Sequence, residues 1–173
     1  MPQKQVNIMP GVATIGAMAD YNNTTPIDHN PQLRAAIDGI KVGGFVWRTT
    51  NPSGSEIERQ SQAWATNTGT GKPAAFVYLN RTLSIPHNAG STLSYTLGAN
   101  LAAAVKGAFY ALATGTAAVG QKVFATLADG AIQTGAAGAT ISGAVETDFE
   151  VKSVVAQNMA DGTSANLMII ANV

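Results

Sequence analysis

One short segment of the chain combines glycines and a lysine at a spacing close to that of a phosphate-binding loop. It reads Thr68-Gly-Thr-Gly-Lys72. A phosphate loop needs a glycine five residues before its Gly-Lys pair, and a Ser or Thr after the lysine to hold Mg²⁺. Here Thr66 occupies the glycine position and Pro73 follows the lysine, so a backbone donor and the magnesium ligand are both missing. We therefore interpret residues 67–73 as a structural loop.

The two histidines are the next residues that could do chemistry. His29 and His87 lie far apart in the sequence, each in a turn-like stretch beside Asn or Pro. Two histidines form a zinc site only with carboxylate help, and Asp28 adjoins His29 too closely to converge with it on one metal. Because the chain has no cysteine, disulfides, thiolate catalysis and cysteine-ligated metals are excluded. We expect no metal site and interpret both histidines as solvated turn residues.

Three carboxylates alternate along a stretch with strand character. Glu146, Asp148 and Glu150 would project from one face of that strand, where they could bind a cation or form a paired acid site. A solvent-facing strand explains the same alternation, and we favour it. The chain also lacks the Gly-x-Ser-x-Gly motif of a serine nucleophile. The sequence therefore predicts neither an enzyme nor a bound cofactor.

The two tryptophans, Trp47 and Trp64, are the largest aromatic side chains present. Exposed rings of this kind could form a platform for sugars, so a carbohydrate-binding β-sandwich is one alternative for the whole protein. Trp47 lies in a segment with strand character. For both rings we favour burial in a core or an interface.

Charged residues are scarce. The 173 residues include 10 basic and 10 acidic side chains, so charge makes up 12% of the chain and the formal net charge is zero. This is about half the usual share of charged residues. Such a composition suits a protein that hides much of its surface in an assembly. We therefore expect a homo-oligomer, with a trimer slightly favoured over a dimer.

Nucleic acids and membranes are not expected partners. No basic run is present that could neutralise phosphates. The most apolar stretch, residues 101–119, is interrupted by Lys106, Gly107 and Gly115, which argues against a membrane span. The N-terminus has no apolar signal core, so we expect synthesis in the cytoplasm.

Residues 1–40 carry many prolines, glycines and asparagines and show no regular period. Prolines remove backbone donors and favour extended backbone, while a disordered tail would have fewer apolar residues. We predict an extended arm over 1–40, ordered by lying on a partner or, alternatively, on its own domain, and a β-rich domain over 41–173. The residues expected to contact the partner or a neighbouring copy are Val6, Ile8, Pro10, Val12, Ile15, Met18 and Tyr21.

Beyond the arm, short strand-like segments alternate with turns. One helical turn is expected at 32–38. Strands are expected at 41–42, 45–50, 74–79, 92–97, 122–128, 131–134, 147–155 and 167–173, with 56–64 as a further candidate. Asp129-Gly130 is expected to form a hairpin turn. This spacing predicts a single all-β domain, built as a β-sandwich or a β-barrel-like fold.

Residues 101–113 fit two structures. Their alanine content favours a helix. Gly107, followed by Ala-Phe-Tyr-Ala-Leu, favours a turn and then a strand. We predict a strand over 107–113.

Four stretches follow one another along the chain in an order that is similar to a known family. They are Pro10-Gly-Val-Ala-Thr-Ile-Gly-Ala-Met-Ala-Asp-Tyr-Asn, Val42-Gly-Gly-Phe-Val-Trp47, Asn67-Thr-Gly-Thr-Gly-Lys-Pro-Ala-Ala-Phe-Val77, and Gly107-Ala-Phe-Tyr with Gly120-Gln-Lys-Val-Phe-Ala and Asp129-Gly130. With them the chain resembles the structural cement proteins, a family of bacteriophage capsid decoration proteins. One departure is Ala75, where a glycine is common in the family.

The resemblance implies a β-rich structural protein that binds the outer surface of a phage head and reinforces the expanded capsid. Its partners would be the major capsid protein and further copies of itself, and its location the virion, after synthesis in the host cytoplasm. The family has no catalytic residues to transfer. The alternatives are another phage structural module, such as a tail, fibre or head-spike protein, and the carbohydrate-binding β-sandwich.

Overall fold

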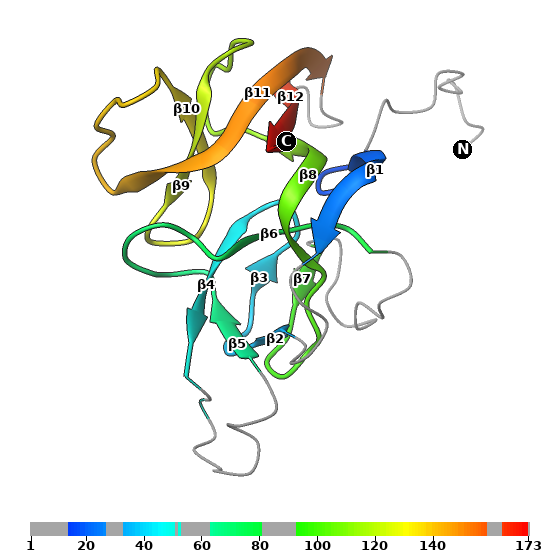
Figure 1. Cartoon of the computed structure of the whole chain (residues 1–173), viewed down its shortest axis with the longest axis vertical. Helices are drawn as coiled ribbons and strands as arrows, with labels where there is room; N and C mark the ends of the chain where they lie inside the picture. The colour runs from blue at the N-terminus through cyan, green and yellow to red at the C-terminus, as the bar shows by residue number, and fades with distance from the viewer. Residues whose placement is uncertain are drawn as a thin grey trace, which may run out of the picture.

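A computed structural model describes residues 14–26, 33–50, 52, 63–80, 93–158 and 164–172 (Figure 1). The regular structure of these residues consists of strands, which confirms the predicted all-β fold. The strands are β1 (Met18–Pro26), β2 (Leu33–Ala35), β3 (Ile40–Lys41), β4 (Phe45–Thr49), β5 (Ala63–Thr66), β6 (Ala75–Val77), β7 (Ser94–Tyr95), β8 (Ala103–Leu112), β9 (Lys122–Thr126), β10 (Ile132–Gly135), β11 (Ala144–Asn158) and β12 (Ser164–Asn172).

One large sheet contains all of these strands except β3 and β7, which pair with each other. The order across it is β10-β9-β11-β12-β8-β6-β4-β5-β2, and β1 lies along β8. Each described strand pair is antiparallel except β2 with β5, which is parallel. Strand β8 pairs with β6 at its start and with β12 further along, so it joins the upper and lower parts of Figure 1.

Both outer strands of the large sheet are covered by neighbouring segments of the chain. Beside β2, the Ala35 N–H donates to Ala99 O and the Leu101 N–H donates to Leu33 O, both at 2.9 Å. This covering segment continues directly into β8. Beside β10, the Thr114 N–H donates to Ile132 O at 2.9 Å. The segment that covers β2 comes just before β8, and the segment that covers β10 comes just after β8. The strands on each side of β8 are therefore closed back onto the ends of β8, and the fold is barrel-like.

Two hydrophobic cores lie on opposite faces of the central strands. On β4, Phe45 and Trp47 pack in the first core, while Val46 between them packs in the second. On β6, Phe76 belongs to the first core and Val77 to the second. Successive side chains of a strand point to opposite faces, so a strand buried on both faces needs a continuous apolar run. This requirement explains the apolar character of both segments.

Aromatic rings fill the first core. The ring centroid of Phe45 lies 5.4 Å from that of Phe76 and 5.6 Å from that of Phe149, both in edge-to-face geometry. The Phe76 and Phe109 centroids lie 4.9 Å apart. Such contacts add to the hydrophobic contribution of these large side chains. Strands β4, β6, β8 and β11 are held together by this cluster.

The predicted hairpin turn at Asp129-Gly130 is confirmed. The Asp129 side chain accepts a hydrogen bond from the Ala131 N–H at 3.0 Å, and Gly130 has a φ of 70°. The turn also packs on β4, because the Phe45 N–H donates to Gly130 O at 2.8 Å. A Cβ at Gly130 would lie 2.1 Å from Phe45 O, so only glycine fits this contact.

Two sequence-based expectations need correction. The strand predicted at 107–113 begins earlier, since β8 runs from Ala103 to Leu112. Buried Ala103 and Ala104 pair with β6, and these tertiary contacts override the helix propensity of alanine. Gly107 lies inside this strand, with a φ of 139°, next to a register shift between β1 and β8. The helical turn expected at 32–38 is also wrong, because Leu33–Ala35 is held as a strand by neighbours on both sides.

Candidate functional site

The segment just before β1 is fixed to the domain by its backbone. The Gly16 N–H donates to Tyr110 O, and Gly16 O accepts from the Leu79 N–H, both at 2.7 Å. Ala17 O accepts from the Tyr110 N–H at 2.9 Å. Gly16 has a φ of 79°, and a Cβ there would lie 2.3 Å from a methyl carbon of Val42. The position therefore requires glycine, and it fixes where the N-terminal segment leaves the domain.

The described residues of the predicted arm lie against their own domain. Residues 18–26 form β1 along β8, and residues 33–35 form β2. Ile15 is half-buried beside Gly43, and Met18 is half-buried against the first core. Tyr21 lies in β1. The remaining arm residues that the sequence singled out lie outside the described residues: Val6, Ile8, Pro10 and Val12. Their partner contacts, and an arm over 1–40, stay predictions.

A cavity of about 170 Å³ lies beside Ile15. The turn at 41–44, the end of β8 at Leu112 and the hairpin turn at 129–132 form its walls. Lys41 and Asp129, which are exposed, are the charged residues in this lining. Most of the remaining lining is apolar side chain or glycine backbone, so the cavity fits an apolar side chain.

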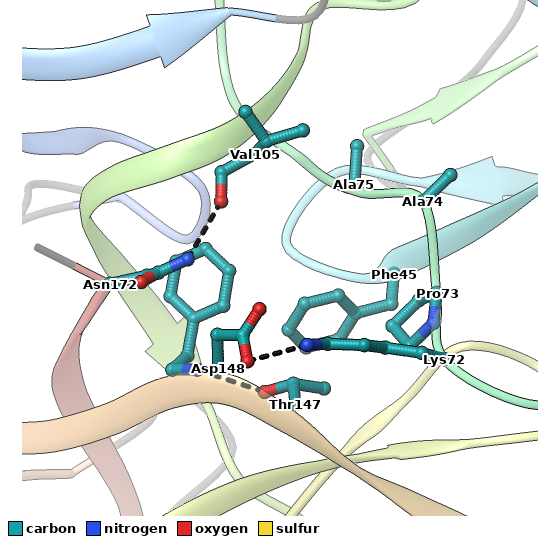
Figure 2. A pocket seen from close by; sticks show the side chains of 10 residues that line it. Phe45, Lys72, Pro73, Ala74, Ala75, Val105, Thr147, Asp148 and Asn172 are labelled. Carbon is teal, nitrogen blue, oxygen red and sulfur yellow. Dashed lines mark hydrogen bonds and ion pairs between the residues drawn. The ribbon is translucent and has the colours of Figure 1, made fainter.

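A second cavity, of about 110 Å³, lies between the loop before β6 and strand β11 (Figure 2). At its mouth, Lys72 Nζ lies 2.5 Å from Asp148 Oδ1, and both side chains are more than half exposed. The side chains of Phe45 and Thr147 also line this cavity. The ion pair links the 67–73 loop to β11, but an exposed pair contributes little to stability.

The loop that resembles a phosphate-binding loop covers Trp47. The indole Nε1–H of Trp47 donates to Gly71 O at 2.8 Å. A Cβ at Gly69 would lie 2.2 Å from the Trp47 ring, so Gly69 lets the loop backbone lie directly on it. The structural interpretation of this loop agrees with these contacts. Trp47 and Trp64 are buried, at 5% and 6% exposed, and neither ring presents a face for stacking on a sugar.

The three alternating carboxylates have separate partners. Glu146 accepts a hydrogen bond from the Gly138 N–H at 2.7 Å, and Asp148 pairs with Lys72. Glu150 lies 2.9 Å from Lys152 Nζ, and the hydrogen bond and charge of Lys152 lower the pKa of Glu150. Within the described ranges, no group of three or more acidic, histidine or cysteine side chains could hold a metal ion. His29 and His87 lie outside these ranges.

A small exposed apolar tip, made of Ile37 and Leu97, is a feature that the sequence did not single out. These side chains are 38% and 52% exposed. Their turns are tied together because the Leu97 N–H donates to Asp38 Oδ1 at 2.8 Å. The two turns are far apart in sequence, so no local pattern could have indicated the tip. Among the described residues there is also no helix long and apolar enough to cross a membrane.

Comparison with known families identifies the kind of protein to which this fold belongs. Residues 3–169 match the family of the XM1 gp53 minor capsid protein. The chain belongs to this family. No curated protein matched the chain. This minor capsid protein is thus a structural component of the phage virion and associates with the capsid, in agreement with the phage structural role that the sequence predicted.

Proposed function

We propose that this minor capsid protein is a decoration protein that binds the outer surface of the expanded head and reinforces it. The observation that carries the proposal is the family match over residues 3–169. The fold is compatible with this role. Because the edge strands β2 and β10 are covered, a partner would bind through side chains, loops and the N-terminal segment and not by adding a strand to the sheet. A capsid family also favours the head over a tail or fibre. We propose no catalytic role.

Reinforcement would follow from a difference in affinity between two states of the shell. A protein that binds the expanded shell more tightly than the unexpanded shell stabilises the expanded state by that difference. A single contact of standard size buries roughly 800 Å² on each partner and need not be tight. Copies joined as a homo-oligomer, with a trimer favoured, would gain avidity from the repeated shell.

One contact to the shell or to a neighbouring copy would come from the N-terminal residues before Thr14. Gly16 and Ala17 are bonded to the domain, and Ile15 and Met18 already pack on it. The thirteen preceding residues could span at most about 45 Å if fully extended. Within these thirteen residues, the apolar side chains that would contact the partner are Val6, Ile8, Pro10 and Val12.

The proposal is tested by adding the purified protein to expanded heads that lack it. We expect saturable binding on the outside of the head, visible in a micrograph-based map, and a higher temperature of DNA release. Unexpanded heads are the matched control and should bind more weakly. Binding to tails alone, or equal binding to both head forms, would contradict a decoration role. Light scattering of the free and bound protein would test the homo-oligomer.

A further inference from the structure

Strand register places three polar side chains in one row across the lower part of the sheet. Arg34 on β2 is the register partner of Trp64 on β5, and it forms a β-bridge with Asn100 on its other side. Registered neighbours on adjacent strands lie about 4.8 Å apart and point to the same face. Their sequence neighbours, such as Leu33, Ala65 and Leu101, pack in the second core. The Arg34 row, meaning Arg34, Trp64 and Asn100, therefore lies on the face opposite that core.

Each member of the Arg34 row has a buried polar atom without a hydrogen-bond partner. These atoms are Arg34 Nε, Trp64 Nε1 and Asn100 Oδ1. The other such atom in the described part of the chain is the Tyr95 hydroxyl, which belongs to the second core. Buried polar groups are nearly always paired, because an unpaired one keeps the full cost of losing water. Three unpaired atoms on registered neighbours therefore point to a missing ligand.

Two members of the row reach the surface with part of their side chains, although the three unpaired atoms themselves are buried. Trp64 is 6% exposed, whereas Arg34 and Asn100 are only half-buried. Its unpaired donors are a guanidinium N–H and an indole N–H, which both need an acceptor. The Asn100 amide can present either its oxygen or its NH₂ group, because the two orientations fill the same space. An anionic acceptor would satisfy this set.

The six acidic side chains in the described residues are engaged elsewhere. Asp38, Asp129 and Glu146 each accept a backbone N–H, and Asp148 and Glu150 pair with lysines. Asp20 also makes an interaction. A carboxylate acceptor for the Arg34 row would therefore come from the chain's four other acids or from another molecule.

We propose that the Arg34 row binds the carboxylate of an acidic side chain on the capsid shell. The planar guanidinium of arginine matches the geometry of a carboxylate, and its charge strengthens the hydrogen bond. One carboxylate can accept from Arg34 and Trp64 together, while Asn100 closes the site on the other side. Because the chain carries little charge, one such pair would contribute strongly to the choice of binding position. This inference rests on the proposed function.

The first experiment uses the free, full-length protein and does not depend on heads. The Arg34 Nε–H and Trp64 Nε1–H signals are followed by NMR during titration with sodium acetate, with sodium chloride at equal ionic strength as control. We expect acetate alone to move both signals downfield. The Trp47 Nε1–H, already bonded to Gly71 O, is an internal reference and should not move. If neither row signal responds, the site does not take a carboxylate and the proposal fails.

The second experiment measures binding to expanded heads. Arg34→Gln and Trp64→Phe should each weaken binding roughly 10- to 100-fold, the effect of losing a hydrogen bond to a charged group. Arg48→Gln removes the same charge from an exposed site on β4 and should bind normally. Unfolding temperatures would show that each variant is folded. Failure of the wild-type protein to bind heads would refute the proposed function, whereas normal binding by Arg34→Gln would refute only this inference.

A third variant separates the shell carboxylate from one of the chain's own. Asp28, Glu56, Glu58 and Asp161 are changed together to their amides. The Arg34 and Trp64 N–H signals of this variant are followed during the acetate titration, and its binding to heads is measured. If its signals respond to acetate while those of the wild type do not, an internal acid fills the row and the proposal is overturned. Loss of head binding to the same extent as in Arg34→Gln would lead to the same conclusion. An unchanged response and unchanged head binding support the shell as the source.

Discussion

Trp47 explains why a glycine-rich loop can look like a ligand site and yet serve the fold. Its ring lies directly beneath Gly69, and its indole N–H is bonded to Gly71 O. An indole buried without a partner for its N–H would be costly, so the loop needs both a close approach and a free carbonyl. The close approach requires Gly69, and the φ of 70° favours glycine at Gly71, so both glycines are explained without any phosphate.

Gly69→Ala should therefore destabilise the fold through a direct clash. The added Cβ would lie 2.2 Å from the Trp47 ring, and we expect a loss of about 2 kcal/mol or more in the free energy of unfolding. Gly71→Ala is the matched control. Its Cβ would meet nothing within 4 Å, so only its φ of 70° is unfavourable, at about 1 kcal/mol. Urea unfolding followed by tryptophan emission measures both losses, and equal losses would argue against the clash.

Thr147 shows how a single hydroxyl supports an irregular strand pair. The register between β11 and β9 shifts between Glu146 and Glu150. Within this bulge the Thr147 hydroxyl donates to Val123 O at 2.8 Å and accepts from the Phe149 N–H at 3.2 Å. It thereby satisfies backbone groups that the shifted ladder leaves unpaired.

Thr147→Val keeps the shape of this buried side chain and removes both hydrogen bonds. We expect it to lower the free energy of unfolding by about 1–3 kcal/mol, since backbone groups in the bulge are left unsatisfied. Thr134→Val removes an exposed hydrogen bond of 3.2 Å to Thr116 O and should change stability by less than about 0.5 kcal/mol. Denaturant unfolding of the two variants measures the difference between their losses of stability. Equal losses would show that water takes over the hydrogen bonds of the Thr147 hydroxyl.

At the scale of elements, the surface of β11 should show a small acid dependence. Lys152 lowers the pKa of Glu150, first through a hydrogen bond and then through its charge, and Lys122 adds a weaker effect. A lowered folded pKa means that the contribution is present above the ordinary value of 4.5 and is lost as pH falls through the folded pKa. Lys152→Met should raise the pKa of Glu150 towards its ordinary value. An NMR titration of the Glu150 carboxyl carbon measures this, and an unchanged pKa would show that Lys152 is not the main cause.

The elements also show which parts of the fold local sequence can predict. β4 and the Asp129-Gly130 turn were predicted because their residue types act over a few positions. The start of β8 was not predicted, since Ala103 and Ala104 are strand residues only through their contact with β6. Neither the covered sheet edges nor the Arg34 row could be predicted, because each joins residues distant in sequence.

The whole molecule is organised around strands that serve two cores at once. β4 and β6 are buried on both faces, and β8 lies next to both covered edges of the sheet. Covered edges protect a β protein from pairing with strands of other chains. The scaffold is thus suited to hold loops and an N-terminal segment in fixed positions. We therefore expect the domain to stay folded when the N-terminal residues before Thr14 are removed.

Removal of residues 1–13 tests the arm at this scale. The deletion must end before Thr14, because Gly16 is bonded to Tyr110 and Leu79, and Met18 packs on the first core. We expect the shortened protein to keep its unfolding free energy within about 1 kcal/mol, since the described hydrogen bonds and both cores remain. Its binding to expanded heads should fall at least tenfold if Val6, Ile8, Pro10 and Val12 make the proposed contacts.

Removal of residues 1–20 is the informative comparison. It also takes away Gly16 and Met18, so both stability and head binding should fall. A variant with Val6, Ile8 and Val12 changed to Ser keeps the chain length, and it should bind heads as weakly as the protein lacking residues 1–13. Sedimentation of heads with bound protein and urea unfolding of the free protein separate the two effects. If the protein lacking residues 1–13 still saturates heads at the wild-type concentration, the N-terminal residues make no important shell contact, and the domain, including the Arg34 row, carries the binding.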